Sequence, residues 1–113
     1  MAPAIPIITI NATDSIGVPL TLTCLSVGGY PQQTVDWYRE TISDNNRLDG
    51  NVTAVQDGLF NVTNRLTFTP NISDNGVKFV CQSTYTGAPQ LIGQTEVVII
   101  SMTKRLPMKL LFR

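Results

Sequence analysis

The chain has 113 residues, of which 42% are hydrophobic and 14% charged, a composition that fits one globular domain. Eight basic residues balance eight acidic residues, so the chain lacks the basic surplus expected of an electrostatic nucleic-acid binder. There is no histidine, which excludes the commonest general base and zinc ligand, and two cysteines are too few for a cysteine-only zinc site.

The first third of the chain predicts an extended lead-in followed by short strands. Residues 1–4 contain proline and are expected to form a lead-in or interdomain linker without the features of a secretory signal. Residues 7–10 form a short β-branched run. Leu20, Leu22 and Cys24 then alternate with threonines, which predicts a half-buried strand.

The remainder continues the same pattern of strands and turns. Strands are predicted at 34–39, 59–69, 77–81 and 91–100, whereas residues 43–50 are rich in Asn and Asp and predict a loop. No stretch keeps a period of about 3.6 residues, so helix is expected to be minor. About seven short strands separated by turns predict an all-β antiparallel sandwich.

Two cysteines and a tryptophan share the inward positions of the predicted strands. Cys24 and Cys81 are 57 residues apart, and Trp37 follows the first by 13 residues. By position alone they are either a pair that bridges two facing sheets or two unrelated buried thiols of a cytosolic β domain. The combination resembles the immunoglobulin superfamily, whose hallmark is this Cys…Trp…Cys spacing. That resemblance implies an inter-sheet disulfide, a core tryptophan and an oxidising compartment.

The run before Cys81 refines the resemblance. Asp74-Asn75-Gly76-Val77-Lys78-Phe79-Val80-Cys81 has one residue more between glycine and cysteine than the tyrosine-corner motif, and Phe79 stands where tyrosine is usual. Together with Gly29-Tyr30-Pro31 and Leu59–Thr63, this is similar to the constant-like, membrane-proximal domains of nectin, nephrin and costimulatory-ligand receptors. The short span from Trp37 to Phe60 leaves little room for the additional strands of a variable domain.

Four tripeptides match the acceptor sequence for N-glycosylation, Asn-x-Ser/Thr. They begin at Asn11, Asn51, Asn61 and Asn71. Any of these asparagines that is glycosylated would have to be exposed, and the protein would have to be secreted. Polar turns rich in Asn, Ser and Thr produce such matches without modification, and both interpretations stay open.

The residues needed for catalysis are missing from the sequence. No histidine accompanies the serines and threonines, and residues 43–50 resemble a calcium loop only superficially, because Leu48 and Arg47 replace oxygen ligands. We therefore expect no enzyme activity, no metal site and no cofactor.

The resemblance implies a non-catalytic extracellular glycoprotein module of an adhesion or recognition receptor that binds a protein partner. The alternatives are a spacer domain without a ligand, or part of a secreted recognition protein. Either way, we expect no nucleic-acid binding, and membrane association only through a longer parent chain. The candidate partner face consists of Tyr38, Arg39, Gln82, Thr84 and Tyr85.

The resemblance ends near residue 101. Residues 5–101 are the expected domain. They contain four basic residues and all eight acidic residues of the chain, so their net charge is −4. Residues 102–113 hold the other four basic residues and are expected to lie outside the fold. They are interpreted as a linker toward a membrane anchor, a basic amphipathic segment or a cloning or gene-end artefact.

Overall fold

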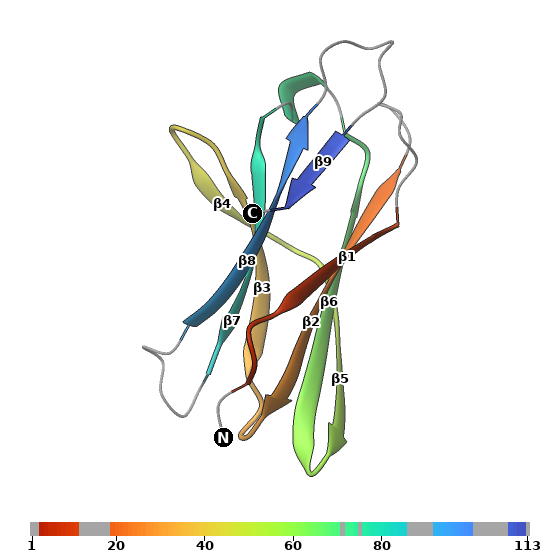
Figure 1. The fold of residues 1–113 in the computed structure, drawn as a ribbon, viewed down its shortest axis with the longest axis vertical. Coiled ribbons are helices and arrows are strands. Elements are labelled where there is room, and N and C mark those ends of the chain that lie inside the picture. Colours follow the sequence, from red (N-terminus) through yellow and green to blue (C-terminus); the bar gives the residue numbers. More distant parts are fainter. Residues whose placement is uncertain are drawn as a thin grey trace.

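The computed structural model describes residues 3–11, 19–70, 72–74, 76–85, 92–100 and 109–112. Over these residues the chain forms nine strands and the short 3₁₀ helix η1 (Ile72–Asp74) (Figure 1). The strands are β1 (Ile7–Asn11), β2 (Leu20–Gly29), β3 (Thr34–Glu40), β4 (Asn45–Leu48), β5 (Asn51–Asp57), β6 (Leu59–Phe68), β7 (Lys78–Thr84), β8 (Ile92–Ile100) and β9 (Lys109–Phe112).

The strands form two antiparallel sheets that pack face to face (Figure 1). The four-stranded sheet has the order β1-β2-β6-β5, and the five-stranded sheet has the order β4-β3-β7-β8-β9. The central pairs, β2 with β6 and β3 with β7, join segments that are distant in the sequence. This arrangement confirms the predicted immunoglobulin-like sandwich.

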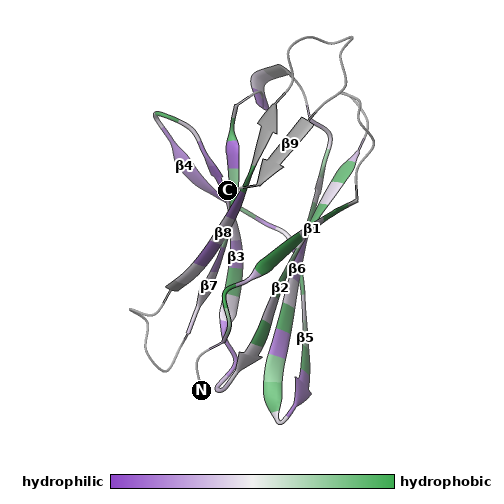
Figure 2. Ribbon diagram, in the orientation of Figure 1, coloured by the Kyte–Doolittle hydropathy of each residue, from purple (hydrophilic) through white to green (hydrophobic). Residues whose placement is uncertain are grey.

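Alternating side chains build the core between the sheets. In β2 the residues from Leu20 to Ser26 alternate between buried and more exposed positions, as the sequence predicts for a half-buried strand. β1 is largely hydrophobic and β4 largely hydrophilic (Figure 2), in agreement with a core that involves the first strand more than the fourth. The buried apolar cluster consists of Ile8, Leu20, Leu22, Cys24, Val35, Trp37, Val62, Leu66, Val77, Phe79, Cys81 and Val97.

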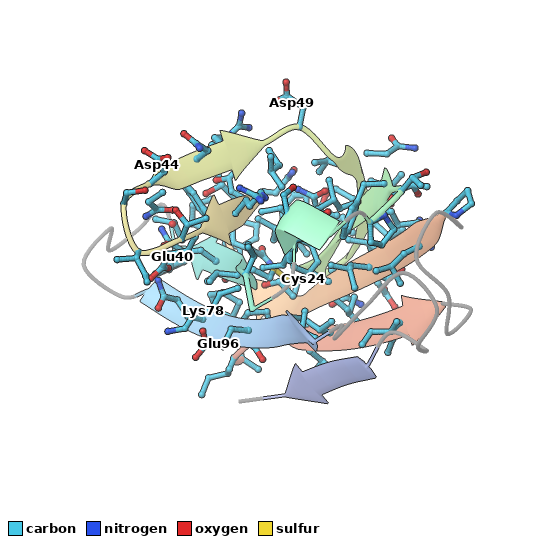
Figure 3. All side chains as sticks on the ribbon, turned by 90° about the horizontal axis from the view of Figure 1, so that it is seen from above. Cys24, Glu40, Asp44, Asp49, Lys78 and Glu96 are labelled. Carbon is cyan, nitrogen blue, oxygen red and sulfur yellow. A yellow bond between two sulfur atoms is a disulfide. The ribbon has the colours of Figure 1, made fainter. Side chains whose placement is uncertain are left out.

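A disulfide links the two sheets through this core. Cys24 of β2 and Cys81 of β7 are bonded, with their Cα atoms 6.4 Å apart, and Figure 3 shows Cys24 between the layers. Trp37 is fully buried and its Nε1–H donates a 2.9 Å hydrogen bond to the carbonyl oxygen of Asn64. The side-chain amide of Asn64 in turn donates to the carbonyl oxygen of Val35 at 2.8 Å. A covalent bond and two hydrogen bonds therefore connect the layers at their centre.

Phe79, which replaces the usual tyrosine, is part of the core. It is buried and stacks on Phe68 of β6, with ring centroids 4.7 Å apart. The nearby turn is held by charge, because Asp74 accepts two hydrogen bonds from the guanidinium of Arg39, at 3.2 and 3.1 Å. An ion pair and aromatic packing thus stabilise this end of the sandwich, where phenylalanine cannot donate the tyrosine-corner hydrogen bond.

Three strands differ from the sequence expectations. β4 forms within the predicted loop 43–50, because Asn45–Leu48 pair with the backbone of β3 from Glu40 to Trp37. β5 was not predicted, and all seven of its residues are exposed, so no buried alternation marks it. β9 pairs residues 109–112 with β8 and is the last strand of the five-stranded sheet, whereas residues 102–113 were expected to lie outside the fold. Residues 102–108 and 113 lie outside the described residues.

Candidate recognition face

The outer surface of the five-stranded sheet carries most of the predicted partner residues. Val35 and Trp37 of β3 point into the core, so Asp36, Tyr38 and Glu40 point outward. Pairing with β7 and β8 continues this surface, with Tyr38 opposite Val80 and Val80 opposite Glu96. We call this surface the five-strand face and define it by Thr34, Asp36, Tyr38, Glu40, Arg47, Lys78, Val80, Gln82, Thr84, Gln94 and Glu96.

Ion pairs organise the charged residues of the five-strand face. Arg47 of β4 contacts Asp36 at 3.1 Å and Asp49 at 3.0 Å. Hydrogen bonding to Asp36, with the attraction of its charge, raises the pKa of Arg47 above its ordinary value. Lys78 contacts Glu96 across β7 and β8 at 3.7 Å. The pair β3–β4 and the pair β7–β8 of this face therefore each carry an ion pair.

Neutral polar groups fill the centre of the same face. Gln94 donates a 2.9 Å hydrogen bond from its Nε2 to the Oε1 of Gln82, directly opposite on β7. Tyr38 lies half-buried on the neighbouring strand β3. Its cross-strand neighbours are Arg47 of β4, which is ion-paired to Asp36, and Val80 of β7.

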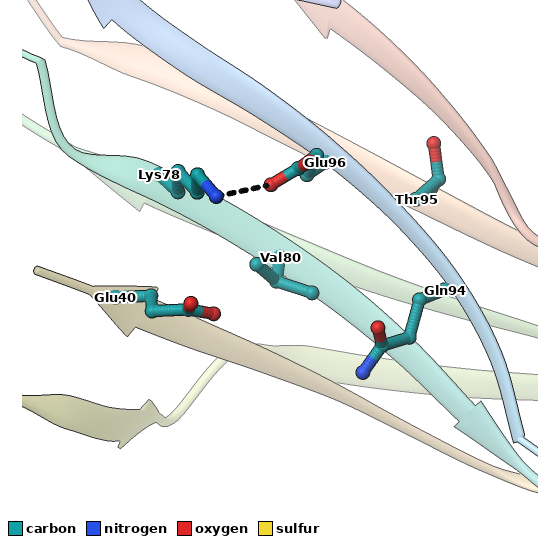
Figure 4. A pocket seen from close by; sticks show the side chains of 6 residues that line it. All are labelled: Glu40, Lys78, Val80, Gln94, Thr95 and Glu96. Carbon is teal, nitrogen blue, oxygen red and sulfur yellow. Dashed lines mark ion pairs between the residues drawn. The ribbon is translucent and has the colours of Figure 1, made fainter. Parts of the chain in front are cut away.

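Two shallow hollows lie at the Glu40 end of the face. The first has a volume of about 290 Å³ and is lined by Glu40, Lys78, Val80, Gln94, Thr95 and Glu96 (Figure 4). The second, of about 340 Å³, shares Glu40 and Lys78 and adds Thr41, Ile42 and Gly76. Ile42 is fully exposed. Hollows of this size are at the lower end of those that bind small ligands.

The structure brings together three of the five predicted partner residues. Tyr38, Gln82 and Thr84 share the five-strand face, and Tyr85 immediately follows β7. The hydroxyl of Tyr85 donates a 2.8 Å hydrogen bond to the carbonyl oxygen of Tyr30. This bond ties Tyr85 to the turn between β2 and β3, away from the centre of the face.

Arg39 does not join this face. It has the inward parity of Trp37 and lies at the end of β3, where its guanidinium binds Asp74 and donates to the carbonyl oxygen of Ser73. The Asp74 side chain is only 10% exposed and that of Arg39 27%. The contacts of Arg39 are therefore those of a structural ion pair.

Sequence reasoning missed several residues of the face. Asp36, Arg47, Gln94 and Glu96 were not selected, although the outward parity of Asp36 follows from buried Val35 and Trp37. Arg47 could not be found because β4 was interpreted as a loop. Gln94 and Glu96 required the register between β7 and β8, which no local pattern specifies.

Three of the four sequon asparagines fall on strands of the other sheet. Asn51 begins β5 and Asn61 lies within β6, both exposed, and Asn11 ends β1 opposite Thr21. Asn71 lies outside the described residues. Hence neither Asn51 nor Asn61 is on the five-strand face.

The described part of the chain contains neither a cluster of metal-ligating side chains nor a membrane-spanning helix. Among those residues, no three His, Cys, Asp or Glu side chains gather in a way that could hold a metal ion. Within the same ranges there is no helix with the length and apolarity required to cross a bilayer.

Comparison with solved structures gives the same fold. The full ectodomain (Ig1–Ig3) of mouse nectin-like molecule 4 matches 86% of this chain with a TM-score of 0.75 and 24% identity. Bovine butyrophilin matches 88% with a TM-score of 0.70 and 19% identity, and Rst D1–D2 matches 84% with 0.70 and 21%. This chain spans 33%, 44% and 47% of those three chains, respectively.

Comparison of sequences assigns the family. No curated protein matches the chain. The family model for CD80-like C2-set immunoglobulin domains matches residues 6–91, which include both cysteines of the disulfide and Trp37. The chain therefore belongs to the family of CD80-like C2-set immunoglobulin domains.

Proposed function

We propose that this domain is a non-catalytic extracellular recognition module that binds a protein partner through the five-strand face. The observation that carries the proposal is the arrangement of that face: a half-buried tyrosine on a regular sheet that also carries one amide pair and two ion pairs. Tyrosine and arginine are enriched where protein interfaces concentrate their binding energy. Because the side chains of these pairs are already restrained, they lose little side-chain entropy on binding.

The charges of the face favour a partner with mixed polarity. Asp36 and Arg47 form one pair and Lys78 and Glu96 another, while Glu40 forms no ion pair within the described residues. The face thus presents alternating signs and one unpaired carboxylate, not a surplus of positive charge. This pattern suits a protein surface with complementary charges and argues against nucleic acid.

An extracellular location is supported by the disulfide and by exposed sequons. The Cys24–Cys81 bond would not persist in a reducing cytosol, and Asn51 and Asn61 are exposed as glycosylation requires. The structure of mouse nectin-like molecule 4 is that of a full ectodomain, Ig1–Ig3. We infer that this chain acts similarly as one domain of a larger surface or secreted protein.

The absence of histidine from the sequence argues against catalysis by the usual base.

The experiment compares alanine variants on the two outer surfaces. The domain is tetramerised with a fluorescent label and its binding to a panel of cell types is measured, while sedimentation at micromolar concentration detects self-association. Tyr38→Ala is expected to reduce whichever binding is observed at least tenfold, the size expected of an interface hot spot. Thr67→Ala, on the outer surface of the four-stranded sheet, is the matched control and should bind as the unmodified domain does.

Two outcomes would contradict the proposal. Equal binding by Tyr38→Ala and the unmodified domain would exclude the five-strand face. Absence of both cell binding and self-association would favour the structural spacer.

A further inference from the structure

The outer surface of the four-stranded sheet, which we call the four-strand face, contains an apolar patch. Ile7 and Val55 are 59% and 65% exposed, and the patch consists of Ile7, Leu25, Val27, Val55 and Leu59. The register makes these residues neighbours, because Ile7 pairs with Leu25 while Val27 and Val55 flank the same residue of β6. A contiguous exposed apolar patch on a soluble domain requires a covering group or favours association.

The residue flanked by Val27 and Val55 is Asn61, the asparagine of a sequon. Asn61 pairs with Val27 on one side and Val55 on the other, and Leu59 precedes it by two positions on the same face. A group attached to Asn61 would therefore extend from within the patch.

The contacts of Asn61 leave the atom needed for glycosylation available. A register shift between Val27 and Gly29 removes the Gly28 N–H from the regular ladder, and this N–H donates a 3.2 Å hydrogen bond to Asn61 Oδ1. In the described part of the chain, Asn61 Nδ2 donates no hydrogen bond. The oxygen has a structural role, whereas the nitrogen, the atom that carries an N-linked glycan, is available.

The second sequon on this surface lies on an unprotected edge strand. β5 is the last strand of the four-stranded sheet, all of its residues are exposed, and Asp57 is its only charged residue. Edge strands usually avoid pairing with other chains by carrying lysine, proline or a bulge. β5 contains no lysine or proline, but it begins with the exposed sequon residue Asn51.

We propose that N-linked glycans on Asn51 and Asn61 cover the apolar patch and the free edge of β5. The inference rests on the proposed extracellular function, because the modification occurs in the secretory pathway. The donor is an oligosaccharide linked to a polyprenyl diphosphate. The Nδ2 nitrogen bonds to the anomeric carbon and loses one proton, while the polyprenyl diphosphate leaves with the electron pair of the broken glycosidic bond.

The same arrangement leaves the opposite surface open. None of the four sequons falls on β3, β4, β7 or β8, the strands that carry the five-strand face. Glycans on Asn51 and Asn61 would therefore restrict protein association to the face that contains Tyr38.

The first test measures occupancy. The full chain is secreted from animal cells behind a removable leader, and glycopeptide mass spectrometry identifies modified asparagines. Thr53→Gln and Thr63→Gln remove one sequon each and keep the Asn61 carboxamide for Gly28, whereas Thr53→Ser and Thr63→Ser retain the sequons. We expect each glutamine variant to lose one glycan and each serine variant to keep it. If the chain without substitutions is secreted and carries no sugar on Asn61, the proposal is overturned. This holds even where Tyr38→Ala still weakens partner binding, a result that would leave the proposed function intact.

The second test measures covering. Sedimentation of the Thr53→Gln/Thr63→Gln variant, which lacks the sequons of Asn51 and Asn61, should shift from monomer to dimer or larger species, and its binding of a hydrophobic dye should increase. Val55→Lys in that background should restore the monomer, whereas Tyr38→Ala should not. A Thr53→Gln/Thr63→Gln variant that stays monomeric with unchanged dye binding overturns the covering role. If Tyr38→Ala restores the monomer and Val55→Lys does not, the covering role is also overturned and the association is assigned to the five-strand face.

Discussion

The two sheets are alike on their inner surfaces and different on their outer surfaces. Both inner surfaces alternate buried side chains, and they meet at the Cys24–Cys81 bond and at Trp37. The five-strand face carries charge and amide pairs, whereas the four-strand face carries threonines, apolar side chains and two exposed sequons. The shared interior accounts for the fold, and the outer surfaces are where specific function can differ between family members.

This comparison predicts which substitutions affect stability and which affect recognition. Changes in the interior should lower the free energy of unfolding whichever sheet supplies the residue. Changes on the outer surfaces should leave stability almost unchanged and alter association. On the five-strand face they should weaken partner binding, whereas loss of the sequons on the four-strand face should increase self-association.

The largest expected effect follows from removing the bond between the sheets. Cys24→Ala/Cys81→Ala opens a loop of 57 residues and is expected to lower the free energy of unfolding by about 4 kcal/mol from loop entropy alone. Chemical denaturation of the double variant, compared with the oxidised and the reduced unmodified domain, measures this loss. An unchanged unfolding midpoint would show that packing alone holds the layers together.

The next largest loss of stability is expected at Arg39. A substitution there tests whether this residue stabilises the fold through Asp74, although it is adjacent in sequence to Tyr38. Arg39→Ala leaves the nearly buried Asp74 carboxylate without its two guanidinium hydrogen bonds, so we expect a loss of about 2–3 kcal/mol. Arg65→Ala, at an exposed arginine of β6, is the matched control and should change stability by less than about 0.5 kcal/mol. Equal unfolding midpoints for the two variants would contradict the structural role. Partner binding should survive Arg39→Ala in the folded fraction.

A smaller loss of stability is expected from a substitution at Gly50, which lies next to Asn64. A Cβ atom at Gly50 would clash with Asn64 Oδ1 and approach the carbonyl oxygen of Arg65. Asn64 cannot move freely, because its amide is bonded to Val35 and its carbonyl to Trp37. Gly50→Ala should therefore cost about 1–2 kcal/mol, as overpacking does.

A double-variant cycle tests this explanation. In an Asn64→Ala background the clash with the side chain is gone, and adding Gly50→Ala should cost much less than it does alone. The same cost in both backgrounds would assign the effect to the backbone of residue 50.

The sequence predicted the interior well because the information there is local. The alternation of Leu20, Leu22 and Cys24, together with the position of Trp37, follows from a period of two residues. The expected strands were those with buried faces. β5 was missed because all of its residues are exposed, and β4 because asparagine-rich segments usually form turns.

The outer surfaces were harder to predict because they depend on register. Tyr38, Gln82 and Thr84 share a face as expected, but Arg39 points to Asp74 of a distant turn. The central pair of Gln82 with Gln94 exists only because β7 and β8 align at those residues. In the same way, the sequence gives four sequons, while only strand pairing places Asn61 between Val27 and Val55.

The smallest stability effects give the sharpest comparison of the two outer faces. Each face has a cross-strand hydrogen bond between directly opposite residues: Thr21 with Thr67 at 3.0 Å, and Gln82 with Gln94 at 2.9 Å. Thr67→Ala and Gln94→Ala should each lower the free energy of unfolding by only about 0.2–1 kcal/mol, the usual value for such pairs.

Binding should separate these two variants where stability does not. Gln94→Ala releases Gln82, which lies opposite Asp36 on the face that contains Tyr38, and should weaken binding of the labelled tetramer to cells. Thr67→Ala lies on the face assigned to glycans and should bind normally. Weaker binding by Thr67→Ala with normal binding by Gln94→Ala would exchange the roles of the two faces. The two hydrogen bonds have nearly the same length, and both residue pairs lie directly opposite across antiparallel strands. A difference in binding would therefore reflect the face on which each residue lies and not the strength of the hydrogen bond that was removed.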